Sequence, residues 1–100
     1  MNENKVNLDE FRKVAHEFYQ HGEDVLVKKQ SDYGPKNISM SPGGPLNGLR
    51  VRMHDKLSRI NNLIDSGVEP ENESLADSFL DLANYSIIAM MVIEGKWPKE

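Results

Sequence analysis

The stretch ESLADSFLDLANYSIIAMMVIE, residues 73–94, decides which fold the chain can adopt. Apolar side chains occupy nearly the whole circumference at a helical repeat, which is typical of a helix surrounded by protein. Ser74 followed by Asp77 is an S-x-x-D capping pattern that predicts the start of this helix, and Gly95 predicts its end. The sequence therefore predicts a central helix over about 74–94.

Two further helices and a long loop precede this central helix. The spacing of apolar residues predicts a first helix over about 7–30 and a second over about 47–64. The loop between them, 31–46, is rich in glycine and proline, and a loop of this length in a small domain is usually functional or disordered. Because no segment alternates with period two, we predict an all-α bundle of three main helices. We expect one domain over 1–100, with the loop ordered over a site.

Composition limits the classes of function. The chain has 100 residues, 38% hydrophobic and 28% charged, and no cysteine, so we expect a cytoplasmic globular domain, in the host cytoplasm if a phage encodes it. A net charge of -4 disfavours binding to nucleic acid polymers, which requires a basic face. The longest apolar run is short of the roughly 20 residues of a membrane helix, so we expect no membrane partner. A chain this small often completes its core by forming a homo-oligomer.

An acidic stripe follows the predicted central helix. Glu73, Asp77 and Asp81 are spaced i, i+4, i+8, and Asn84 lies on the same side. Neighbouring carboxylates repel, and buried ones need partners, so a cation must face them. Mg²⁺ is suited to this role because it prefers oxygen ligands, which makes the three acids candidate metal ligands. In the alternative interpretation Glu73 is exposed, Asp77 only caps the helix with Ser74, and Asp81 pairs with an arginine.

The predicted second helix carries a complementary basic line. Arg52, Lys56 and Arg59 are spaced i, i+4, i+7, and Lys56 lies in the middle of the apolar arc. A lysine in that position either extends to the edge of the core or is held by an acid. We therefore expect Lys56 to pair with Asp77 and Asp81 across a helix contact, although a solvated basic face is the alternative. Arginine and lysine also suit polyphosphate binding.

The loop offers groups that recognise a base. Tyr33 can stack on a base, Asn37 can hydrogen-bond to its edge, and the Gly-Gly-Pro at 43–45 lets backbone approach a phosphate. Neither G-x-x-x-x-G-K-[ST] nor G-x-G-x-x-G occurs, so a P-loop is excluded.

Three motifs in order resemble the nucleotide modification associated domain family: DYGPKNI at 32–38, GGPLNGLRVRMHDKLSRINNLI at 43–64 and NESLADSFLDLANYSIIAMMVIEGKW at 72–97. The resemblance covers about 28–97. Proteins of this family are small, frequent in phages, and similar to the MazG-like all-α nucleoside triphosphate pyrophosphohydrolases. The resemblance implies a MazG-like helical bundle that binds a nucleotide and hydrolyses a (d)NTP to the monophosphate and pyrophosphate with Mg²⁺.

In MazG-like enzymes acids on two helices hold the metals, and the resemblance implies that Asp77 and Asp81, with Asn84, are the later half of that set. The leading hypothesis is a phage-type pyrophosphohydrolase in which Asp77 and Asp81 are catalytic and hold Mg²⁺ together with Glu73. By their own chemistry, the ligand-binding residues would be Tyr33, Asn37, Arg52, Lys56, Arg59 and Asn84. The E-E-x-x-E pattern of MazG-like enzymes is not visible in the first helix. This departure favours an alternative, a non-catalytic sponge that sequesters a nucleotide or cyclic nucleotide signal, as some phage anti-defence proteins do. A third hypothesis is a structural module whose acidic and basic stripes pair across subunits.

Overall fold

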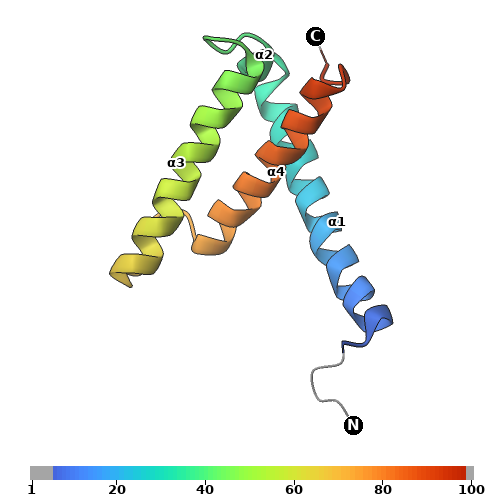
Figure 1. Ribbon diagram of the computed structural model, residues 1–100, viewed down its shortest axis with the longest axis vertical. Helices are drawn as coiled ribbons and strands as arrows, with labels where there is room; N and C mark the ends of the chain where they lie inside the picture. The colour runs from blue at the N-terminus through green and yellow to red at the C-terminus, as the bar shows by residue number, and fades with distance from the viewer. Residues whose placement is uncertain (1–5, 99–100) are drawn as a thin grey trace.

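The computed structural model describes residues 6–98, and within that range it contains four helices and no strand (Figure 1). In chain order they are α1 (Leu8–Tyr33), α2 (Lys36–Ser39), α3 (Pro45–Ser66) and α4 (Leu75–Ile93). The prediction of an all-α fold is confirmed, and the three long helices lie where the sequence places them. The loop expected over 31–46 is shorter than predicted, because α1 continues to Tyr33 and the four-residue α2 follows.

The ends of the long helices have local causes. The Asn7 side chain caps α1 by accepting hydrogen bonds from the N–H groups of Asp9 and Glu10 at 3.1 and 3.2 Å. The Ser74 hydroxyl caps α4 by accepting from the Asp77 N–H at 3.1 Å. Gly67 ends α3 with a φ of 66°, a left-handed conformation that glycine adopts without steric cost.

The helix α4 is the centre of the fold. It runs antiparallel to α3, and α1 crosses it on another side, so that α4 contacts both (Figure 1). At the crossing Gly22 of α1 is buried, and the Asn84 side chain donates a hydrogen bond to its carbonyl at 3.2 Å. The missing side chain at Gly22 lets the two helices approach closely, which explains a glycine inside an otherwise regular helix.

The hydrophobic core is small. Ile38 from α2, Leu49 from α3 and Ile88 from α4 form its buried cluster, with Leu26 and Trp97 packed against them. This cluster joins all four helices and the segment after α4 at one end of the molecule. By length and composition alone α4 is also apolar enough to cross a membrane, a test that the core helix of a soluble protein passes as well.

Candidate functional site

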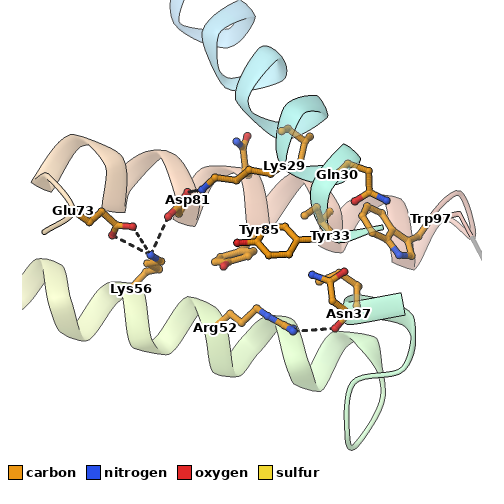
Figure 2. Close-up of a pocket in the computed structure, with 14 residues that line it drawn as sticks. Lys29, Gln30, Tyr33, Asn37, Arg52, Lys56, Glu73, Asp81, Tyr85 and Trp97 are labelled. Atoms are coloured by element: carbon orange, nitrogen blue, oxygen red, sulfur yellow. Dashed lines mark hydrogen bonds and ion pairs between the residues drawn. The ribbon is translucent and has the colours of Figure 1, made fainter. Parts of the chain in front are cut away.

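A cavity of about 430 Å³ opens beside this core, between the C-terminal end of α1, α2, α3 and α4 (Figure 2). Its lining divides into two kinds of side chain. One end is ionic, and the other is aromatic and amide-bearing. The ionic side chains are Lys29, Lys56, Glu73 and Asp81, and the other end carries Gln30, Tyr33, Asn37, Tyr85 and Trp97.

The ionic end is built around Asp81. Its Oδ2 lies 2.9 Å from Nζ of Lys56, and its Oδ1 lies 2.8 Å from Nζ of Lys29. Lys56 also contacts both carboxylate oxygens of Glu73, at 2.8 and 3.0 Å. The Asp81 side chain is only 9% exposed, so both of its oxygens are satisfied by ammonium groups rather than by bulk water. The apolar helix α4 can hold this nearly buried acid because two lysines from different helices, Lys29 of α1 and Lys56 of α3, form ion pairs with it.

Burial and pairing act in opposite directions on these groups. Burial raises the pKa of the Asp81 carboxyl, but the hydrogen bonds from Lys29 and Lys56 outweigh it, and the pKa falls below its ordinary value of 3.8. Burial lowers the pKa of Lys56, but hydrogen bonds to Glu73 and Asp81 raise it above 10.5. The hydrogen bond to Asp81 raises the pKa of Lys29. All three groups are therefore charged at neutral pH.

Arg59 holds Glu73 in place from outside the cavity. Its Nε donates to the Ser78 hydroxyl at 3.1 Å, and its Nη2 donates to the backbone carbonyl of Glu73. Ser78 is fully buried and donates in turn to Glu73 Oε2 at 2.7 Å. Arg59 was predicted to bind a ligand, but it is not among the residues that line the cavity. In this structure it fixes the position of Glu73.

Asp77 is a second predicted site residue that does not line this cavity. Its side chain is exposed, and no ion pair to it forms among the described residues, so the expected pairing of Lys56 with Asp77 is absent whereas that with Asp81 is present. Asp77 lines a second cavity of about 340 Å³, which it shares with Glu73 and Asp81. Lys56 reaches Glu73 and Asp81, four residues before and four after Asp77, whereas the Asp77 side chain is exposed to solvent.

The three acids do not fit a metal site as they stand. Glu73 and Asp81 are occupied by Lys56, Lys29 and Arg59, and a metal would have to displace these cations. Within residues 6–98 no group of three His, Cys, Asp or Glu side chains is placed to hold a metal ion. The donor set is therefore arranged for ammonium and guanidinium groups rather than for Mg²⁺.

The aromatic end is assembled from distant segments. Trp97, in the segment after α4, donates from its indole N–H to the carbonyl of Pro35 at 3.1 Å and so holds that segment against the start of α2. Tyr85 from α4 and Tyr33 from the end of α1 also line this end, and Tyr33 is 66% exposed (Figure 2). Aromatic faces from three segments thus border one half of the cavity.

Arg52 lies between the two ends. Its Nη2 donates to the carbonyl of Asn37 at 2.9 Å, and its Nη1 donates to the Ser41 hydroxyl at 3.4 Å (Figure 2). These bonds attach α2 and the loop after it to the wall of the cavity. Of the predicted ligand-binding residues, Tyr33, Asn37, Arg52, Lys56 and Asn84 all line the cavity.

Sequence reasoning missed Lys29, Gln30, Tyr85 and Trp97, which line the same cavity. A signal for Lys29 was present, because it falls on the apolar side of the first helix, three residues after Leu26 and seven after Gly22. This is the same anomaly that identified Lys56. No pattern indicated Trp97, since its place depends on how the chain folds back after α4.

The fold and cavity together define a small all-helical domain with a cavity of mixed ionic and aromatic lining. Residues 29–93 match the family described as nucleotide modification associated domain 1, and the chain belongs to that family. The matched segment contains every residue that lines the cavity except Leu26 and Trp97. No curated protein and no solved structure matches the chain.

Proposed function

We propose that the cavity binds a nucleotide, with the phosphate at the ionic end and the base at the aromatic end. The observation that carries this proposal is the convergence of Lys29 and Lys56 on Asp81 in a cavity whose other end is bordered by Tyr33, Tyr85 and Trp97. The ionic end suits the phosphate of a nucleotide, and the aromatic end suits its base. The name of the family, which associates it with nucleotide modification, supports the same class of ligand.

Lys29 is the cation best placed to meet a phosphate. Its side chain is 50% exposed while Nζ lies on Asp81, so its remaining N–H donors face accessible space. Arg52, on the neighbouring wall, adds a guanidinium that can form forked hydrogen bonds to phosphate oxygens once it exchanges its bonds to the loop. Lys56 contributes its positive charge from a more enclosed position.

The aromatic end suits a base because every base has a π-face that stacks on an aromatic ring, and such stacking contributes about 1–3 kcal/mol per base. Gln30 and Asn37 add side-chain amides at this end, each with donors and an acceptor for the edge of a base. A cavity of about 430 Å³ also lies within the range of ordinary small-ligand sites.

The charge of the lining favours a ligand with few phosphate charges. Three cations, Lys29, Arg52 and Lys56, are offset by two carboxylates, Glu73 and Asp81, which leaves one net positive charge. This charge suits a nucleoside monophosphate or a cyclic nucleotide better than a triphosphate. We therefore favour binding without turnover, as in a phage-encoded protein that sequesters a nucleotide signal.

A Mg²⁺-dependent (d)NTP pyrophosphohydrolase is the second candidate. Two facts support it: the resemblance to MazG-like enzymes, and the presence of Glu73, Asp77 and Asp81 together on the second cavity. Because two of these acids are held by lysines, this function requires a rearrangement on ligand binding.

A thermal-shift panel tests the proposal and separates the candidates. Purified protein is melted with nucleoside mono- and triphosphates and with cyclic nucleotides, each in Mg²⁺ and in EDTA, and pyrophosphate release is assayed in parallel. Stabilisation by a nucleotide in EDTA, without turnover, is the expected result, since a ligand that binds only the folded state raises the melting temperature. Pyrophosphate release in Mg²⁺ would favour the hydrolase. An unchanged melting temperature with every nucleotide would contradict both.

A further inference from the structure

The N-terminal half of α1 presents an apolar stripe that no other segment within residues 6–98 covers. Leu8, Phe11, Ala15 and Phe18 continue, at helical spacing, the same side of α1 that carries Gly22 where α4 crosses. Beyond the crossing α1 projects away from α4 (Figure 1). As a result Phe11 is 63% and Phe18 71% exposed. A helix that buried only its C-terminal half would not need this stripe.

The helix α4 has a second uncovered apolar face. Two of its sides meet α3 and α1, and Phe79, Ile87 and Met90 occupy the remaining side at spacings of eight and three residues. All three are exposed. This face and the α1 stripe belong to the two helices that cross at Gly22.

The surface area measures how much of the molecule lacks a cover. The chain exposes 8021 Å², whereas a compact folded monomer of 11.4 kDa exposes about 5800 Å². The excess, about 2200 Å², is of the size that one partner contributes to a large obligate interface. The small core is consistent with this excess of exposed area, because the buried hydrophobic residues of the described chain are only Ile38, Leu49, Ile60 and Ile88.

We propose that a second copy of this chain covers the α1 stripe and the outer face of α4, forming an obligate, two-fold homodimer. In a two-fold interface the same surface occurs on both partners, so the apolar surface of one copy packs against the apolar surface of the other. The excess exposed area of both copies is then buried in one interface. A net charge of -4 argues against an anionic membrane as the cover. A second copy is present wherever the chain is, which an obligate cover must be.

Sedimentation equilibrium of the full chain tests this proposal. The wild type should have twice the mass of the chain, whereas the double variant Phe11→Glu with Phe18→Glu should have the mass of one chain. The dissociation constant of the dimer should rise at least about 100-fold in this variant. The control is Lys13→Gln with His16→Glu, which makes the same change of net charge on the exposed polar side of α1 and should stay dimeric.

Circular dichroism checks that the variants keep their helix content. If the glutamate variant loses it, Phe11→Ala with Phe18→Ala repeats the test with the residue that favours helix most. A wild type with the mass of one chain overturns the proposal, including one that binds instead to vesicles of anionic lipid. An alanine or glutamate variant that stays folded and dimeric overturns it as well.

Discussion

The two ends of the cavity are held together in different ways. At the ionic end Asp81, Lys29, Lys56 and Glu73 satisfy one another at 2.8 to 3.0 Å, and Arg59 fixes Glu73 from outside. The aromatic end has the Trp97 indole bond to Pro35, while Tyr33 lies largely in solvent. The ionic end is therefore preorganised and balanced in charge. The aromatic end is open and able to adjust to a base.

This contrast predicts that changes at the ionic end act mainly on stability, and changes at the aromatic end mainly on affinity. The largest effect is expected for Lys56→Met. The substitution keeps the length of the side chain but leaves Glu73 and Asp81 each without one cation in a semi-enclosed site. Breaking such a pair costs about 3 kcal/mol of unfolding free energy, to be measured by urea denaturation. The control, Lys28→Met, changes an exposed lysine of α1 and should have little effect. Equal destabilisation by both would contradict the assignment.

A second test compares two acids one turn apart on α4. Asp81→Asn removes the charge on which two lysines meet and should cost about 2 kcal/mol, since hydrogen bonds to charged groups contribute about 1.5–3 kcal/mol each. Asp77→Asn removes only an exposed charge near the helix start, and should cost about 0.5 kcal/mol. Urea denaturation of both variants measures the difference. If Asp77→Asn were the more damaging change, the division of the acidic stripe would be wrong.

The pH dependence of the unfolding free energy tests the role of the Asp81 ion pairs in a second way. Because the folded-state pKa of Asp81 lies below its ordinary value of 3.8, its carboxylate stabilises the protein fully above that value. This stabilisation is lost as the pH falls through the depressed pKa. The difference in unfolding free energy between wild type and Asp81→Asn should therefore be constant near neutrality and shrink below about pH 4. Urea denaturation curves of both proteins across this pH range measure the difference. A difference in unfolding free energy that grows on acidification would contradict the role of the Asp81 carboxylate.

The effect on stability is expected to be smaller at the aromatic end than for Lys56→Met or Asp81→Asn. Trp97→Phe keeps an aromatic ring but removes the indole donor to Pro35, a loss of about 1 kcal/mol. Affinity for the nucleotide should fall several-fold, because the segment after α4 is then held less firmly. Urea denaturation and a ligand titration by calorimetry measure the two effects separately. Full affinity in Trp97→Phe would show that this segment takes no part in binding.

The same contrast separates what the sequence could predict from what it could not. Lys56 and Asp81 were predictable, because a charge on the apolar side of a helix must have a partner, and helical periodicity reveals which side a residue occupies. The approximate ranges of the three long helices were predictable from the same periodicity, and the start of α4 from its S-x-x-D pattern. Tyr85 was not, since residues on the apolar side of a helix do not reveal whether they face a cavity or a core. Trp97 was not, since its place depends on how the chain folds back after α4. Asp77 was misplaced because the i, i+4, i+8 spacing does not show which of the three acids face Lys56 and which face solvent.

The most direct test of nucleotide binding uses the single tryptophan of the chain, Trp97, which borders the cavity. Its fluorescence is followed while a nucleoside monophosphate chosen from the thermal-shift panel, or the matching nucleoside without phosphate, is added in EDTA. We predict a saturable change with both ligands and an affinity at least about tenfold lower for the nucleoside, equivalent to about 1.4 kcal/mol for the phosphate contacts. Equal affinities, or no response of Trp97 to either ligand, would contradict the placement of phosphate and base in this cavity.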